Sequence, residues 1–267
     1  MRFDEPDNGF KRFVIHTRYL RFVARRIHLQ YTSKVSQDTR VKLRFGTSDH
    51  WVAEEMFDTR PYERYFSPEA GQVVVDAGAN IGCFTLRSAR LVGPSGSVLA
   101  FEPSAGSFSI LMKNLRLNGL RNTLAMNFGL GEKEDMSKYW VYDSSLLNST
   151  AHEVRRKDAK LVGTERVQLR VLDDVLDEER IKRLDYLKLD TEGAELAILR
   201  GAKKSLSRFH PRIAGEAHPG WSDSGATILE YLKIFGYKGL VEPAPSKDAE
   251  FFYAWPPDDD FKLMPVQ

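Results

Sequence analysis

The chain has 267 residues, 42% of them hydrophobic, which is enough for one sizeable α/β domain. Its 39 Lys and Arg nearly balance 37 Asp and Glu, which argues against a protein that wraps nucleic acid. The single cysteine, Cys83, excludes an intrachain disulfide and a cysteine-based zinc site, so we expect a cytoplasmic protein. We find no apolar run with the length of a signal peptide or a membrane span.

Positive charge is concentrated at the front of the chain, where residues 1–45 hold 11 Lys and Arg against 4 Asp and Glu. Between residues 9 and 29 the apolar residues recur at steps of three and four, with Lys and Arg between them, which predicts a basic amphipathic helix. Two interpretations stay open. The helix packs on the domain with its charges solvated, or it makes peripheral contact with an anionic membrane or an acidic partner.

The next segments predict alternating helices and strands. Residues 47–57 have the pattern of a helix, with Ser48 or Asp49 at its N-cap. The continuous apolar run 73–75 predicts a strand that is buried on both faces of a parallel sheet. The following elements are a glycine turn, a helix at 84–91, a strand at 97–101, a helix at 107–117 and a strand at 123–128. This order predicts right-handed crossovers and a doubly wound α/β sheet.

The second half of the chain begins less regularly. Strands at 138–142 and 166–172 flank a polar stretch, 143–163, that is a candidate lid or a surface loop. Alternation then returns with a strand at 185–190, a helix at 194–206, a strand at 212–217, a helix at 225–237, and closing strands at 238–241 and 250–255.

The turn after the first apolar strand reads D-x-G-x-N-x-G, formed by Asp76, Gly78, Asn80 and Gly82. Its glycines permit close approach of a ligand, and the helix that follows offers unpaired N–H groups. The spacing differs from the G-x-G-x-x-G of dinucleotide sites, and no G-K-[ST] follows. An NAD-dependent oxidoreductase is therefore the weaker enzymatic alternative.

The acidic residues beside this turn favour a cationic ligand without phosphate, because a carboxylate repels a pyrophosphate. S-adenosylmethionine, with its ammonium and sulfonium groups, meets that requirement. Glu102 ends the second strand, where a carboxylate can accept both hydroxyls of an adenosine ribose. Asn127, after the third strand, is either part of the adenine-side wall or simply a turn residue.

These motifs carry a resemblance to a known family. The stretches "VVVDAGANIGCFTL", "LAFEP", "DYLKLDTEGAELAILRGA" and "GEAHPG" look like the FkbM family of S-adenosylmethionine-dependent methyltransferases, and "RFGTSDHWVAEEMF" resembles its lead-in. The resemblance implies a seven-stranded, Rossmann-like class I methyltransferase sheet with helices on both faces. It also implies O-methylation, often of sugar or polyketide hydroxyls. We therefore divide the chain into a basic extension, 1–45, and a methyltransferase domain, 46–267.

Catalytic candidates follow two neighbouring strands. Asp190 and Glu192 end one strand, and Glu216 and His218 end the next. The carboxyl ends of the parallel strands in an open α/β sheet lie at the same edge, where ligands bind. We therefore expect these four residues to lie close together, with Asp190 also near the cofactor. His218 is the preferred base because its ordinary pKa is about 6.5. The same quartet is a candidate site for a divalent metal ion.

The sequence also bears on the methyl acceptor. The motifs N-P-P-Y and D-P-P-Y, typical of methyltransferases that act on base amino groups, are absent after the fourth strand, where "DTEG" stands instead. We therefore expect a small-molecule or glycan acceptor and disfavour nucleic acid. A non-catalytic Rossmann-like domain that docks a membrane or nucleic acid through the basic front helix stays the alternative of a different class.

Overall fold

The computed structural model describes residues 29–142 and 160–259, with the exception of residues 221 and 247. The predicted basic helix at 9–29 lies outside the described residues except for its last residue, and so does most of the predicted loop at 143–163. Within the described part of the chain, no helix is both long enough and apolar enough to cross a membrane.

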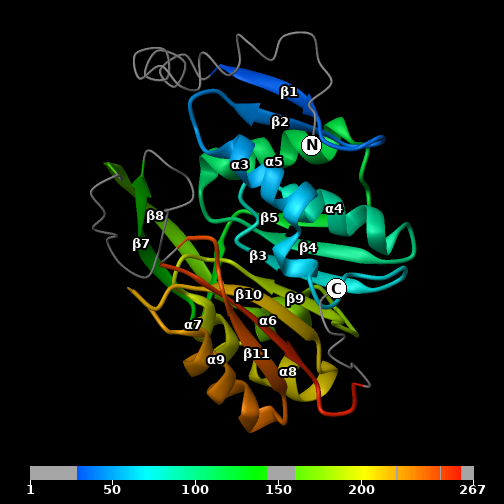
Figure 1. The fold of residues 1–267 in the computed structure, drawn as a ribbon, viewed down its shortest axis with the longest axis vertical. Helices are drawn as coiled ribbons and strands as arrows, with labels where there is room; N and C mark the ends of the chain where they lie inside the picture. Colours follow the sequence, from blue (N-terminus) through cyan, green and yellow to red (C-terminus); the bar gives the residue numbers. More distant parts are fainter. Residues whose placement is uncertain (1–28, 143–159, 221, 247, 260–267) are drawn as a thin grey trace.

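A seven-stranded sheet forms the centre of the molecule, in the order β11-β12-β10-β9-β3-β4-β5 (Figure 1). Its strands are β3 (Val73–Ala77), β4 (Ser97–Phe101), β5 (Thr123–Met126), β9 (Tyr186–Leu189), β10 (Arg212–Ala217), β11 (Lys238–Pro243) and β12 (Glu250–Trp255). The five strands from β10 to β5 pair in parallel, and β12 runs antiparallel to both of its neighbours. The predicted doubly wound seven-stranded fold is confirmed.

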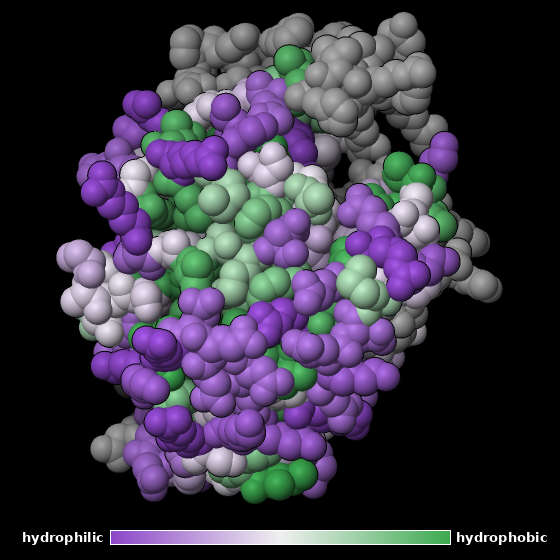
Figure 2. All heavy atoms as spheres, turned by 180° about the vertical axis from the view of Figure 1, so that it is seen from behind, coloured by the Kyte–Doolittle hydropathy of each residue, from purple (hydrophilic) through white to green (hydrophobic). Residues whose placement is uncertain are grey.

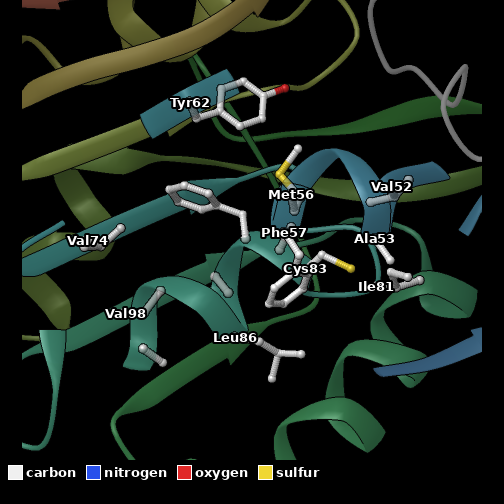
Figure 3. Close-up of a cluster of buried hydrophobic side chains, with 14 of the residues drawn as sticks. Val52, Ala53, Met56, Phe57, Tyr62, Val74, Ile81, Cys83, Leu86 and Val98 are labelled. Atoms are coloured by element: carbon white, nitrogen blue, oxygen red, sulfur yellow. The ribbon is translucent and has the colours of Figure 1, made fainter. Parts of the chain in front are cut away.

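Helices cover both faces of this sheet because alternate side chains of each strand face opposite ways. Val74 packs into one core and Val75 into the other. The helices α3 (Asp49–Glu54), α4 (Cys83–Val92) and α5 (Ala105–Leu117) lie in the upper half of Figure 1, and α6 (Leu172–Glu178), α7 (Glu195–Arg200), α8 (Lys203–Phe209) and α9 (Gly225–Leu232) lie in the lower half. Figure 3 shows part of the first core, whose side chains include Val74, Leu86 and Ile81.

Two predicted helices differ in detail from the structure. The predicted helix at 47–57 is α3 followed by a π-helical turn, η1 (Glu55–Thr59). Ser48 holds the N-cap position without a capping side-chain hydrogen bond, and Asp49 pairs with Arg44 instead. The predicted helix at 194–206 is divided into α7 and α8 at Gly201. A Cβ at Gly201 would lie 2.2 Å from the Gly131 carbonyl oxygen, so this close approach requires glycine.

The ends of two other predicted elements shift. The predicted strand at 166–172 belongs to β8 (Leu161–Val171), and Leu172 already begins α6. The predicted helix at 225–237 ends as α9 at Leu232 and continues as a short 3₁₀ turn, η4 (Lys233–Phe235). A second 3₁₀ turn, η2 (Pro61–Glu63), precedes the sheet.

Two small sheets were not predicted. The hairpin of β1 (Gln30–Lys34) and β2 (Arg40–Arg44) lies within the predicted N-terminal extension. Asn114 of α5 accepts a hydrogen bond from the N–H of Lys42 at 2.6 Å and donates to its carbonyl at 3.2 Å, so the hairpin is fixed to the domain. The other sheet has the order β6 (Gly129–Gly131), β8 and β7 (Asp135–Tyr142).

The face opposite to the view of Figure 1 is mostly hydrophilic, with an apolar area near its middle (Figure 2). Large hydrophobic side chains are exposed at a few scattered positions of the described chain, among them Trp51, Leu117 and Leu124. Scattered exposed apolar side chains are normal on globular proteins and do not define a site.

Candidate active site

A pocket opens at the carboxyl ends of β3, β4 and β9. From β3, the chain extends the sheet first to one side, through β4 and β5, and later to the other side, through β9 and β10. The pocket therefore lies where the strand order changes direction. It encloses about 660 Å³, including open solvent at its mouth. Its lining consists of Ala77, Gly78, Asn80, Phe101, Glu102, Pro103, Ser107, Gly129, Leu130, Tyr139, Asp190, Thr191, Glu192 and Ala194. Ligands of open α/β sheets bind outside the carboxyl ends of the strands at such a switch point.

The turn after β3 has the backbone geometry that its glycines predict. Gly78 and Gly82 have φ angles of +78° and +90°, and Asn80 has φ +50°. A Cβ at Gly78 would lie 1.8 Å from the carbonyl oxygen of Asp190, so the turn passes directly against the end of β9. The buried Oδ1 of Asn80 has no hydrogen-bond partner among the described residues. An unsatisfied buried acceptor at a pocket wall is suited to receive a ligand's donor.

Asp76 does not line the pocket and is fully buried. Its Oδ1 is 3.1 Å from Nζ of Lys188, and its Oδ2 accepts a hydrogen bond from the Thr85 hydroxyl at 2.5 Å. Lys188 also lies 3.4 Å from Oδ2 of Asp190 and donates to the carbonyl of Gly78 at 2.8 Å. The carboxylate of Asp76 is thus engaged by side chains of the protein, and Lys188 links it to the turn.

The charge of this buried lysine is held in place by its two partners. Burial acts to lower the pKa of Lys188, but Asp76 and Asp190 outweigh burial, and the pKa is raised above its ordinary value. Lys188 is therefore a charged ammonium shared by two carboxylates.

Glu102 lines the pocket and is only 4% exposed. Its Oε2 accepts from the N–H of Asn80 and its Oε1 from the N–H of Ser104, both at 2.8 Å. Burial raises its pKa to about 7, although these two N–H groups oppose the shift. A carboxylate oxygen has two acceptor sites, so each keeps room for one further donor. The placement is compatible with the predicted contact to ribose hydroxyls.

Asn127 does not line the pocket. Its Nδ2 donates to the carbonyl oxygens of Glu102 at 2.8 Å and Pro103 at 3.2 Å. Of its two predicted roles, the structure describes the bracing of a turn, because these bonds fix the backbone that carries Glu102. Gly82 likewise lies outside the lining and is the N-cap residue of α4.

The four predicted catalytic side chains lie near one another at the ends of β9 and β10. Nε2 of His218 is 3.3 Å from Oε2 of Glu192 and 3.9 Å from Oε1 of Glu216. Asp190 and Glu192 line the pocket, and His218 is 4% exposed beside it. Burial, followed by the charges of Asp190 and Glu55, raises the pKa of Glu216 well above its ordinary value.

Glu195 has a structural role that differs from that of Glu192. Its Oε1 accepts hydrogen bonds from the N–H groups of Thr191 and Gly193 and from the Thr191 hydroxyl. It thereby fixes the loop that carries Glu192.

In the described part of the chain, no three His, Cys, Asp or Glu side chains are grouped so that they can hold a metal ion.

Sequence reasoning missed several polar residues of this region. Ser107 and Tyr139 belong to the pocket lining. Tyr62 of η2 donates to Oε2 of Glu216 at 3.3 Å, and burial raises the pKa of Glu55 in η1 to about 7. Glu55 stands in the stretch that resembles the family's lead-in, so that resemblance was the one available signal.

The comparisons with known proteins agree on the family. A family model described as the methyltransferase FkbM domain matches residues 76–238. The chain is 34% identical over 166 residues to "Methyltransferase 1" of Beauveria bassiana, which covers 57% of this chain and 66% of that protein. It is 30% identical over 224 residues to the 31-O-demethyl-FK506 methyltransferase FkbM of Streptomyces tacrolimicus, which covers 73% of this chain and 84% of that protein.

A solved structure supports the same fold. The methyltransferase FkbM from Methylobacillus flagellatus KT superposes with a TM-score of 0.52 at 20% sequence identity. The match covers 74% of this chain and 47% of that chain, so the protein spans about half of the solved relative and about two thirds of the first curated one. Since the family model covers more than half of its residues, the chain belongs to the FkbM family of S-adenosylmethionine-dependent methyltransferases.

Proposed function

We propose that this protein transfers the methyl group of S-adenosylmethionine to a hydroxyl of a saccharide, a glycan or a related small metabolite. The observation that carries the proposal is the pocket at the switch point, which Gly78, Glu102 and Asp190 help to line. O-methylation is the reaction implied by the name of one relative, the 31-O-demethyl-FK506 methyltransferase.

The residues present fit this cofactor. Glu102 would accept the ribose hydroxyls, and the buried Oδ1 of Asn80 offers an acceptor that has no hydrogen-bond partner among the described residues. The turn at Gly78 and Gly82 has the open backbone that close approach of a nucleoside needs. Asp76 supports the turn through Lys188, Asn127 supports the backbone of Glu102, and Asp190 faces the cationic end of the ligand.

When bound, S-adenosylmethionine supplies a methyl group on a good sulfonium leaving group. The main work of the protein is then alignment, for which intramolecular reactions show effective molarities of roughly 10⁵ to 10⁸ M. His218 and Glu216 are the candidate bases that receive the proton of the acceptor hydroxyl, a contribution of about 10²- to 10⁴-fold. Glu192 orients His218 across their 3.3 Å contact.

Calorimetry with S-adenosylmethionine and with NAD tests the choice of cofactor. We expect binding of the first alone, and Glu102→Ala should weaken it because the ribose acceptor is lost. Asp135→Ala, at an exposed position of β7, is the matched control and should bind normally. Binding of NAD, or unchanged affinity in Glu102→Ala, contradicts the placement of the cofactor.

The acceptor is tested by offering a radiolabelled methyl donor and the protein to fractionated cell extract. Label in a base-labile ester contradicts a hydroxyl acceptor, and label in nucleic acid contradicts a saccharide or small-metabolite acceptor. A stable methyl ether on a saccharide or small metabolite supports the proposal. Cell fractionation tests the expected cytoplasmic location and the peripheral membrane contact through residues 9–29. Complete absence of turnover with every fraction favours the non-catalytic alternative.

A further inference from the structure

The segment before the first core strand is fixed to the sheet at Tyr62. The buried Tyr186 hydroxyl of β9 donates to the carbonyl of Tyr62, and the Tyr253 hydroxyl of β12 donates to the carbonyl of Pro61 at 2.7 Å. The Tyr62 ring meets Phe84 and Phe251 edge to face, with centroid distances of 5.9 and 5.8 Å. Two hydroxyls from separate strands and two aromatic contacts therefore set the position of this side chain.

The hydroxyl of Tyr62 points away from the neighbouring hydrophobic cluster (Figure 3) and reaches Oε2 of Glu216 at 3.3 Å. Burial, reinforced by the charges of Asp190 and Glu216, raises the pKa of Tyr62 well above its ordinary value. The phenol therefore keeps its proton near neutral pH and acts as a donor. The Nζ of Lys188 lies 5.4 Å from the centre of the same ring. Tyr62 thus stands between the buried ammonium and the Glu216 carboxyl.

Glu55 brings a second carboxyl to this place from the π-helical turn η1. Burial and then Asp190 raise its pKa to about 7, while Lys188 opposes the shift. Isolated π-helical turns occur frequently at functional sites, because the extra residue re-aims a side chain. Glu55 is also one of the charges that raise the pKa of Glu216, after burial and Asp190.

We propose that Glu216 accepts the proton of the acceptor hydroxyl, that Tyr62 is the positioning residue that holds Glu216 for this step, and that Glu55 contributes a neighbouring charge. The proposal rests on the proposed function and names residues ahead of the segment that the family model matches. In the step, the new O–CH₃ bond forms as the S–CH₃ bond breaks, a neutral thioether leaves, and the hydroxyl proton passes to the Glu216 carboxylate and then to solvent.

The positive charge of the cofactor would affect the protonation of the Glu216 carboxyl. Burial and the charge of Asp190 raise the pKa of both Glu55 and Glu216, which favours their neutral forms. A sulfonium bound beside Asp190 would favour the ionised form, in which Glu216 can act as a base. A neutral sulfur in the same place would not have this effect.

The charged and titratable groups around Glu216 come from every neighbouring element. Tyr62 and Glu55 lie on the segment before β3, Lys188 and Asp190 lie on and after β9, and Glu195 begins α7. Glu192 and His218 complete the group, with His218 3.9 Å from Oε1 of Glu216. The bound sulfonium is the one component of this set that differs between S-adenosylmethionine and S-adenosylhomocysteine.

The experiment measures proton release by calorimetry at pH 7 in two buffers of different ionisation enthalpy, with these two ligands as probes. S-adenosylmethionine should release more protons than S-adenosylhomocysteine. Any contribution of Glu102 to ribose binding is common to both ligands and cancels.

Glu55→Gln and Glu216→Gln should each reduce this difference, and Tyr62→Phe should move its maximum to higher pH, because the lost hydrogen bond had lowered the pKa of Glu216. Asp58→Asn, exposed on the same turn, is the matched control and should behave like the wild type. Equal proton release by the two ligands, or an unchanged difference in both Gln variants, overturns the proposal while leaving cofactor binding intact. Failure of the wild type to bind either ligand refutes the proposed function instead.

Discussion

Replacement of Lys188 by Met should be one of the most destabilising single changes in this chain. The ammonium lies 3.1 Å from Asp76, whose carboxylate is fully buried. At an effective dielectric constant of about 20, a pair at this distance attracts by roughly 5 kcal/mol. Desolvation of both ions offsets much of that attraction, but removal of one partner leaves the other charge buried without compensation, which typically costs about 3–5 kcal/mol.

Urea unfolding of Lys188→Met, Asp76→Asn and the double variant measures this cost. The double variant should be less destabilised than the sum of the two single variants, because it contains no isolated buried charge. Lys182→Met, at an exposed position in the turn before β9, is the control and should change stability little. A loss below about 1 kcal/mol in Lys188→Met, or strict additivity in the double variant, refutes the reasoning.

The pH dependence provides a second readout of the same contact. The pKa of Lys188 is raised above its usual value of 10.5 on folding. Its stabilising contribution is therefore complete below pH 10.5 and is lost as the pH rises through the folded-state pKa. The difference in unfolding free energy between wild type and Lys188→Met should shrink only in that alkaline range. A difference that instead vanishes in mild acid contradicts this assignment.

Three further outcomes are expected. Gly78→Ala should abolish cofactor binding in calorimetry, since its Cβ would stand 1.8 Å from the Asp190 carbonyl oxygen; normal affinity contradicts this close approach. Affinity for both S-adenosylmethionine and S-adenosylhomocysteine should rise as the pH increases through about 7, where Glu102 ionises and becomes a stronger acceptor, and Glu102→Gln should flatten that rise. Asn114→Leu should lower the unfolding free energy by about 1–3 kcal/mol, because the carbonyl of Ile81, 2.8 Å from Nδ2, loses its donor; an unchanged urea midpoint contradicts it.

The central sheet was predictable because its strands are buried on both faces and read as continuous apolar runs. Residues 73–75 mark β3 in this way, and the predicted closing strand at 250–255 matches β12 at both ends. The small sheets lack such a signal. β6 has only three residues, Gly129–Gly131, and its partner β8 begins thirty residues later, so no local sequence pattern predicts the pairing of these strands.

The site was predictable where it depends on strand ends alone. Glu102 and Asp190 directly follow β4 and β9, and Glu216 lies near the end of β10. Parallel strands bring such residues to the same edge of a sheet. The contacts of Tyr62 with this edge were not predictable, because they depend on how the segment before β3 returns over the sheet. The hydrogen bonds from Tyr186 and Tyr253 that hold it there join residues 124 and 192 positions apart.

The charged partner of Asp76 becomes visible only in the pairing of the strands, and the sequence motif alone does not show it. From the sequence, a buried carboxylate beside a glycine turn calls for a positive charge, and a cationic ligand was inferred. In the paired sheet, Asp76 stands directly opposite Lys188, so the protein provides that charge itself. Lys188 nevertheless faces two carboxylates, since Asp190 lies 3.4 Å away, and one ammonium cannot neutralise both. The residue whose charge favours a cationic cofactor is therefore Asp190 and not Asp76. Asp190 lines the pocket, where a sulfonium can balance the remaining negative charge.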